Sequence, residues 1–183
     1  MKKDLCFTLL ILIMMQLFAC SKITRDDLMM PYAMVNLIDK KGYDFAGLQV
    51  NGEHDEYHFE LYKHQGKVII LYEIRNKTDC QLLEKLYNEY DKNTKGVLIY
   101  GYMKERDIYS DLGSLPKWFK MWETNYPLLF FDDDARELWE FYDYPTILIL
   151  DEDCFIRVAY NFDIEYDTLK KAVKYVIEKG YND

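Results

Sequence analysis

Apolar and polar positions change period along the chain, and these changes predict strands alternating with helices. Two nearly continuous apolar runs, KVIILYEI at 67–74 and GVLIYGY at 96–102, are typical of strands covered on both faces. Between them, residues 76–90 carry apolar side chains three and four positions apart, which predicts an amphipathic helix. The apolar stripe of that helix comprises Leu82, Leu83, Leu86, Tyr87 and Tyr90.

The C-terminal half continues this alternation. PLLFF at 127–131 predicts a short strand, and the acidic segment that begins at Asp132 predicts a short helix. YPTILIL and FIRVAY predict two strands joined by the turn 151–154, and a last helix is expected at 165–179. Strands and helices in this order predict an α/β domain, with a central mixed β-sheet flanked by helices.

The segment before residue 66 has a different pattern. EYHFELY alternates apolar and polar side chains, which predicts a strand with one buried face, and three glycines divide the remainder into short pieces. We therefore expect a β-rich N-terminal extension at 31–65, ahead of the main domain at 66–183.

The first residues predict export. Two lysines precede an apolar stretch at 5–18 that is too short to span a bilayer comfortably, as in a secretory signal peptide. The stretch leads into Leu-Phe-Ala-Cys, which resembles the lipobox of bacterial lipoproteins. This resemblance implies a lipoprotein signal peptide at 1–19, a lipidated Cys20 and a tether at 20–30. An ordinary signal peptide or an uncleaved anchor is the alternative.

The net charge of the chain argues against one class of binding partner. The 183 residues carry a formal net charge of −9 and contain no block of lysines or arginines, which argues against a nucleic-acid partner. Attachment to a membrane is therefore expected to come from the lipid on Cys20. Ser21 is not the aspartate that retains such lipoproteins in the inner membrane of enteric bacteria. The outer membrane, on its periplasmic or surface side, is the expected location.

Three pieces of the chain resemble the thioredoxin superfamily, particularly its membrane-anchored thiol–disulfide oxidoreductases and peroxiredoxin-like relatives. They are GKVIILYEI, the segment YPLLFFDDDARELWEFYDYPTILILDEDCFIRVAY, and the C-terminal helix, which together span roughly residues 66–180. The resemblance implies a thioredoxin-like fold. It also implies that Pro145, which follows Tyr144, is a cis proline facing the active site of the family. An ordinary trans proline at the start of a strand is the alternative.

The redox motif of this family is missing from the chain. Redox members carry Cys-x-x-Cys at the start of the first helix, where the helix dipole lowers a thiol pKa and the second thiol resolves the mixed disulfide. Here the two places fall on Thr78 and Gln81 or, one residue earlier, on Lys77 and Cys80. In the first register Thr78 and Gln81 are predicted to form a capping box, with Thr78 as the N-cap. Neither register contains two thiols.

Cys80 is left as a lone thiol with two interpretations. If Thr78 is the N-cap, Cys80 occupies the second helical position, close to unpaired N–H groups that favour a thiolate, while the neighbouring Asp79 opposes one. The peroxiredoxin pattern Thr-x-x-Cys with a preceding proline is not met. Cys80 is either a single catalytic thiol or a small structural residue in the first turn of the helix, and we favour the structural interpretation.

The remaining candidates are weaker. The strand after residue 145 is expected to run away from the helix start, so Cys154 should lie roughly 25–30 Å from Cys80, which is too far for a disulfide. His54 and His58 are four residues apart on a predicted strand, which separates them by ~13 Å and prevents them from sharing a metal ion. We expect no metal and no cofactor.

Two functional hypotheses follow from the sequence. The first is a lipid-anchored, thioredoxin-fold protein of the cell envelope without dithiol redox activity, which binds or scaffolds a protein partner. Its binding surface would consist of Thr78, Gln81, Tyr144 and Pro145. The alternative is a thiol-dependent oxidoreductase or peroxidase that uses Cys80 as its single active thiol.

Overall fold

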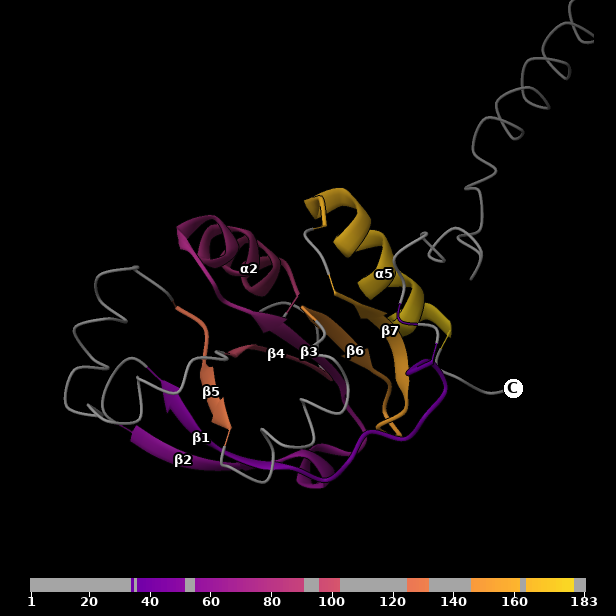
Figure 1. Cartoon of the computed structure of the whole chain (residues 1–183), viewed down its shortest axis with the longest axis horizontal. Helices are drawn as coiled ribbons and strands as arrows, with labels where there is room; N and C mark the ends of the chain where they lie inside the picture. Colours follow the sequence, from indigo (N-terminus) through magenta and orange to yellow (C-terminus); the bar gives the residue numbers. More distant parts are fainter. Residues whose placement is uncertain are drawn as a thin grey trace, which may run out of the picture.

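In the computed structural model of the chain, seven strands form one sheet in the order β2-β1-β5-β4-β3-β6-β7 (Figure 1). The structure describes residues 34, 36–51, 55–90, 96–102, 125–131, 146–161 and 164–179. The strands are β1 (Ala46–Asn51), β2 (Asp55–Glu60), β3 (Val68–Glu73), β4 (Val97–Tyr102), β5 (Leu128–Phe131), β6 (Ile147–Leu150) and β7 (Ile156–Tyr160). The helices are the 3-10 turn η1 (Leu61–His64), α2 (Lys77–Glu89) and α5 (Tyr166–Lys179). This arrangement confirms the expected α/β class with a central mixed sheet.

The middle of the sheet is formed by the strands with the most apolar sequences. β3 runs parallel to β4 and antiparallel to β6, which in turn pairs antiparallel with β7. Every residue of β3 is buried, which confirms the expectation of a strand covered on both faces.

The N-terminal extension belongs to the same sheet. β1 pairs antiparallel with β2 on one side and with β5 on the other, while β5 runs parallel to β4. The extension is therefore β-rich, as expected, and it lengthens the sheet by a hairpin at one end. That hairpin leaves β2 as the last strand on its side of the described sheet.

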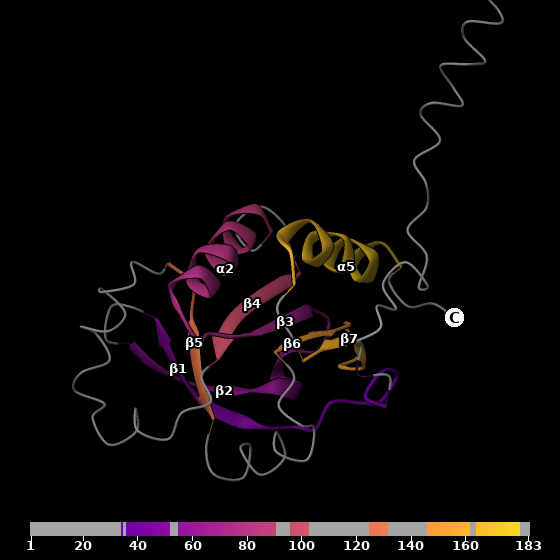
Figure 2. The ribbon, with the colours of Figure 1, turned by 45° about the horizontal axis from the view of Figure 1, so that its top comes forward.

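Helices α2 and α5 lie side by side on one face of the sheet (Figure 2). A core of apolar side chains fills the space beneath them, including Ile70, Tyr72, Leu83, Leu86, Ile149, Leu169, Val173 and Val176. The predicted helical stripe packs on this core, with Leu83 and Leu86 buried and Leu82, Tyr87 and Tyr90 half-buried against it. Asp79 and Cys80, in the first turn of α2, are buried as well.

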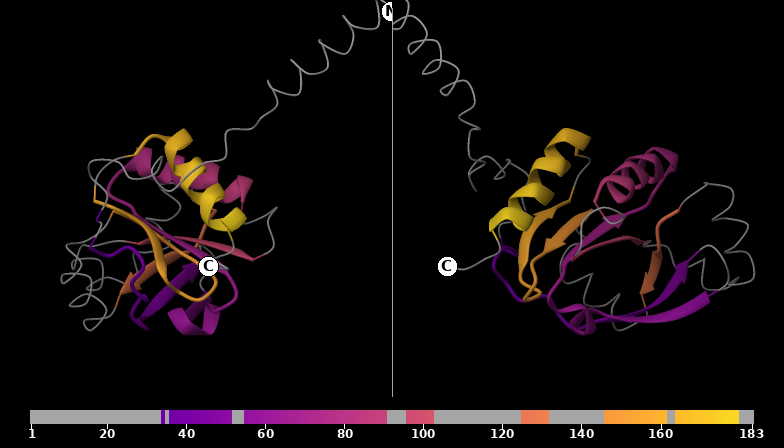
Figure 3. Two further views of the ribbon diagram at one scale, coloured as in Figure 1. Left: turned by 90° about the vertical axis from the view of Figure 1, so that its right-hand side faces the viewer. Right: turned by 180° about the vertical axis from the view of Figure 1, so that it is seen from behind.

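The opposite face of the sheet carries a second apolar core. Its members come from alternate positions of the central strands and from the extension, and include Leu37, Phe45, Phe59, Leu61, Ile69, Leu71, Tyr100 and Leu148. Residues 36–45, which we call the N-terminal strap, run along the outer side of β7 before the chain enters β1 (Figure 3). The strap and η1 help to cover this second core.

Several expectations concern residues outside the described part of the chain. They are the signal peptide, Cys20, the tether, the helix from Asp132, and the Tyr144–Pro145 pair with its expected cis bond. Within the described residues, no helix combines the length and the apolar character needed to cross a membrane.

Candidate functional site

The candidate site lies where β3 ends and α2 begins. β3 and β4 are parallel, and ligands of open α/β sheets bind outside the carboxyl ends of such strands. The connection from Glu73 to α2 is short, and the Glu73 N–H donates to the Thr146 carbonyl oxygen (2.8 Å). Thr146, which follows Pro145 in the sequence, therefore lies beside the end of β3.

Asn76, not Thr78, is the N-cap of α2. Its backbone is extended (φ −159°), and its Oδ1 accepts hydrogen bonds from the N–H groups of Thr78 (2.8 Å) and Asp79 (3.1 Å). The predicted capping box of Thr78 and Gln81 is therefore wrong. Because β3 is followed by only a short connection, the helix begins at Lys77, and asparagine is among the best residues for the position before it.

The side chains at the helix start divide into exposed and buried groups. Lys77, Thr78 and Gln81 are exposed, as expected for residues that could contact a partner. Asp79 is buried, and its Oδ2 accepts a hydrogen bond from the Arg75 N–H (3.0 Å). The start of α2 is thus stabilised by hydrogen bonds to two side chains, the exposed Asn76 and the buried Asp79.

Arg75 lies between two buried carboxylates. Its Nε is 3.3 Å from Asp79 Oδ2 and 3.8 Å from Glu73 Oε2, while its Nη2 donates to Asp79 Oδ1 (3.4 Å). These contacts compensate the burial of the two carboxylates at the end of β3. Sequence analysis missed this cluster, although the spacing of Arg75 and Asp79, four residues apart across a helix start, was a usable signal.

Cys80 is the fourth residue of α2 and only 2% exposed, so the expected second helical position is wrong. Its N–H already donates to the Asn76 carbonyl oxygen (3.3 Å). Burial raises the pKa of the Cys80 thiol more than the neighbouring Tyr126 hydroxyl lowers it, and the charges of Asp79 and Glu84 raise it further. The thiol is therefore protonated at neutral pH, whereas a nucleophilic cysteine must be a thiolate.

Tyr126 is the group that faces Cys80. Its side chain is 1% exposed, and its hydroxyl forms no hydrogen bond of ordinary geometry among the described residues. The thiol and the hydroxyl are close enough to influence each other's pKa, since burial first and Cys80 second raise the pKa of Tyr126. Their relative geometry is nevertheless not that of a hydrogen bond. A buried hydroxyl in this state costs free energy.

Two contacts explain how Tyr126 reaches α2. Asn125 Nδ2 donates to Glu84 Oε1 (2.6 Å), which ties the segment before β5 to the helix. Gly101 in β4 leaves room for the ring, because a Cβ there would lie 2.9 Å from Tyr126 Cε2. A glycine inside a strand often marks such a close approach, and this was the signal in the sequence that could have been followed.

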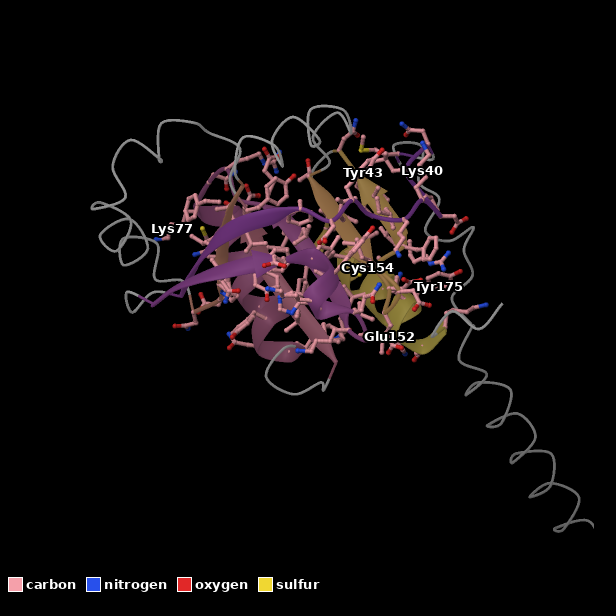
Figure 4. All side chains as sticks on the ribbon, turned by 90° about the horizontal axis from the view of Figure 1, so that it is seen from below. Lys40, Tyr43, Lys77, Glu152, Cys154 and Tyr175 are labelled. Carbon is pink, nitrogen blue, oxygen red and sulfur yellow. The ribbon has the colours of Figure 1, made fainter. Side chains whose placement is uncertain are left out.

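The two described cysteines are not joined. Both Cys80 and Cys154 are free and buried, which confirms that they form no intramolecular disulfide. In Figure 4, Cys154 lies far from Lys77, the first residue of α2. Among the described residues, no group of three or more histidine, cysteine or acidic side chains is arranged to hold a metal ion.

Comparisons with known proteins identify the fold. A scan of protein-family models and a search of curated sequences gave no match. Three solved structures are similar over most of the chain. A thiol-disulfide oxidoreductase thioredoxin domain from Bacteroides vulgatus is 19% identical, with a TM-score of 0.58, over 76% of this chain and 97% of its own. A Bacteroides sp. thiol:disulfide interchange protein is 18% identical (TM-score 0.59; 79% and 95% covered).

The third is a mitochondrial 2-Cys peroxiredoxin from Plasmodium falciparum, 15% identical with a TM-score of 0.59, covering 80% of this chain and 97% of its own. The chain therefore has a thioredoxin-like fold, as the resemblance in the sequence implied. The start of α2, where the sequence lacks a Cys-x-x-Cys motif, carries the Asn76 cap, the Arg75 cluster and a buried Cys80.

Proposed function

We propose that this thioredoxin-like protein is a lipid-anchored component of the cell envelope that binds a protein partner and has no dithiol redox activity. The observation that supports this proposal most is which side chains are exposed at the start of α2. Asn76 is exposed, and its side chain accepts hydrogen bonds from the first N–H groups of the helix. Cys80 is buried one turn further on. A thiol in that state is a poor nucleophile.

The same place offers a polar contact surface, which we call the α2-start surface. It consists of the exposed residues Arg75, Lys77, Thr78 and Gln81. Arg75 is held in place by Asp79 and Glu73, so a partner would meet a guanidinium that is already oriented. Tyr144 and Pro145, the other residues of the predicted binding surface, lie outside the described residues. Carbonyl and carboxylate groups of a protein segment are the ligands that this surface fits.

Site-specific photocrosslinking tests the binding function. A photoreactive side chain at Gln81 is expected to give a discrete adduct in intact cells, and the Gln81 side chain is exposed in the first turns of α2. The matched control carries the same group at Lys171, an exposed position on α5. Adducts at both positions, or at neither, would contradict a specific partner at the α2-start surface.

A second candidate function is supported by a different observation. The solved structures most like this one include proteins named as thiol-disulfide oxidoreductases and peroxiredoxins, and those names support a thiol-dependent enzyme more than they support binding. Cys80 lies in the first helix after β3, beside the buried hydroxyl of Tyr126. In this function the α2 start would have to open, so that the Cys80 thiolate could attack a peroxide. A sulfur–oxygen bond would form as the peroxide bond breaks, giving a sulfenic acid and an alcohol or water.

One set of measurements separates the two functions. Consumption of hydrogen peroxide and reduction of insulin disulfides are measured for the wild type, Cys80→Ala and Cys154→Ala. Binding without redox chemistry predicts that all three proteins equal the buffer. Activity that Cys80→Ala abolishes and Cys154→Ala retains would overturn the first function and establish the second.

The anchor is tested separately. If Cys20 is lipidated, Cys20→Ala is expected to move the protein from the membrane fraction to the soluble or unprocessed fraction and to abolish incorporation of labelled palmitate. Cys154→Ala serves as the control and is expected to leave both unchanged. Equal palmitate labelling of wild type and Cys20→Ala would rule out the proposed anchor.

A further inference from the structure

The strap closes one edge of the sheet by bonding to β7. The Asp39 N–H donates to the Ile156 carbonyl oxygen (2.8 Å), and the Ile156 N–H donates to the Lys40 carbonyl oxygen (2.8 Å). Lys41 forms an isolated antiparallel bridge with Phe155. An uncovered strand edge would present these N–H and C=O groups to other chains, so the strap acts as the cover of β7.

Arg157 forms ion pairs with Asp39 and Asp151 that hold the strap in place, and we call these ion pairs the latch. Arg157 of β7 donates from Nη1 to Asp39 Oδ1 of the strap (2.7 Å) and from Nε to Asp151 Oδ2 of the hairpin turn (2.6 Å). Asp151 is buried, and its other oxygen accepts the N–H groups of Asp153 (3.0 Å) and Phe155 (2.9 Å). Arg157 therefore connects the strap to a turn that is itself rigidly bonded.

The strap also lies against Cys154, which is buried, and the charges of Lys41 and Asp44 on the strap are close enough to influence the pKa of its thiol. The Gly42 N–H donates to the Cys154 carbonyl oxygen (2.7 Å), and Tyr62 closes the layer by donating from its hydroxyl to the Gly42 carbonyl oxygen (2.7 Å). The chain can approach this closely because Gly42 has no side chain. A Cβ there would lie 2.7 Å from Leu150 Cδ2. Figure 4 shows Lys40 and Tyr43 on the strap in the same part of the molecule as Cys154.

The strap is held much less firmly than the sheet beneath it. Asp39, Lys40, Lys41, Tyr43 and Asp44 are all exposed, and Tyr43 reaches 48%. Only two apolar side chains of the strap, Leu37 and Phe45, are buried in the described core. Local opening occurs preferentially in segments with few buried apolar contacts and with backbone bonds near solvent.

We propose that the strap is a latched cover which opens as a unit while the sheet stays folded, exposing both the Cys154 thiol and the edge of β7. Within the latch, Asp39 is the releasable partner of Arg157 because its side chain is 42% exposed while that of Asp151 is 5% exposed.

Thiol labelling of the full chain tests this proposal, with peptide mass spectrometry reporting Cys80 and Cys154 separately. In native buffer we expect iodoacetamide to label Cys154 at least about tenfold faster than Cys80, and with a weaker dependence on urea, because local opening exposes less surface than unfolding. Burial raises the pKa of both thiols, so each is expected to react only after an opening exposes it.

Variants of the latch give the decisive comparison. Asp39→Ala is expected to increase the labelling rate of Cys154 about tenfold, which corresponds to about 1.4 kcal/mol, and to leave that of Cys80 unchanged. Glu152→Gln is the control, because it removes a negative charge from an exposed side chain of the neighbouring hairpin turn and not from the strap. Tyr62→Phe removes a second strap contact and provides an independent variant. The proposal is overturned if the two cysteines share one rate and one urea dependence, or if neither variant alters the labelling of Cys154.

Discussion

The surroundings of Cys80 and Cys154 show two ways of burying a thiol in one small domain. Cys80 lies inside a continuous helix, packed on the core beneath α2 and α5. Cys154 lies in a hairpin turn with a φ of 64°, a conformation that disfavours side chains with a Cβ, and it is covered by a strap from the start of the domain. In both cases burial raises the thiol pKa.

The difference lies in what must break to expose each sulfur. Exposing Cys80 requires α2 to leave the sheet, which would uncover a core with Leu83 and Leu86 fully buried. Exposing Cys154 requires loss of the latch and of two buried side chains of the strap. Equal burial in the folded state therefore does not mean equal protection, because protection depends on the free energy of the opening that exposes the group.

The largest expected effect comes from two leucine-to-alanine substitutions, one in the core that buries Cys80 and one in the strap beside Cys154. Leu86→Ala in α2 should lower the free energy of unfolding by about 2–5 kcal/mol, since it leaves a cavity in the main core. Leu37→Ala in the strap should lower it by about 1–2 kcal/mol, because the strap can shift to fill the space. Urea unfolding followed by circular dichroism measures both, and equal losses would show that strap and core unfold together.

Removing the Tyr126 hydroxyl beside Cys80 should increase the stability of the fold. Tyr126→Phe is expected to raise the free energy of unfolding by about 1–2 kcal/mol, because it deletes a buried polar group that forms no hydrogen bond among the described residues. Tyr62→Phe is the control, since the Tyr62 hydroxyl donates to the Gly42 carbonyl oxygen (2.7 Å) and its removal should lower stability. A loss of stability in Tyr126→Phe would mean that the hydroxyl has a partner.

The backbone of the hairpin turn gives a prediction for the Cys154 side. Cys154→Gly should be at least as stable as Cys154→Ala, by up to about 1–2 kcal/mol, because glycine adopts a positive φ without strain. At most positions an alanine variant is more stable than a glycine variant. Thermal unfolding of the two variants decides the matter, and a more stable alanine variant would show that the turn relaxes when the thiol is removed.

The smallest effect concerns the contact that fixes α2 against α5 above Cys80. Glu89 accepts a hydrogen bond from Tyr166 and pairs with Lys170, and these contacts lower its pKa. Because the pKa of Glu89 is lower in the folded state, its ionised carboxylate stabilises the fold at pH values above the ordinary pKa of glutamate. This contribution is lost as the pH falls through the folded-state pKa. Glu89→Gln should cost about 0.5–1 kcal/mol at pH 7, discounted for the exposure of the pair, and almost nothing in acid.

The control for that measurement is Glu178→Gln, whose partner Lys174 lies on the same helix and whose side chain is mostly exposed. It should change stability little at any pH. If the two variants behave alike between neutral and acid pH, the bond between Glu89 and Tyr166 does not hold the helices together.

Much of the fold could be read from local patterns. The apolar run of β3, the hairpin of β6 and β7, and the period of α5 each predict their element, because burial on one or both faces imposes a spacing on neighbouring residues. The cap of α2 was misjudged although it is local. Thr78 satisfied a capping rule, but Asn76 satisfied it two residues earlier, and the length of the connection after β3 decided between them.

The sequence by itself determined the alternation of strands and helices, the β-rich extension, and the absence of a second thiol at the start of α2. Only the tertiary structure decided that Cys80 points into the core, that Tyr126 faces it across Gly101, and that residues 36–45 seal β7 through Arg157. These features join segments far apart in the chain. Their formation depends on how the sheet assembles, which no spacing of neighbouring residues encodes.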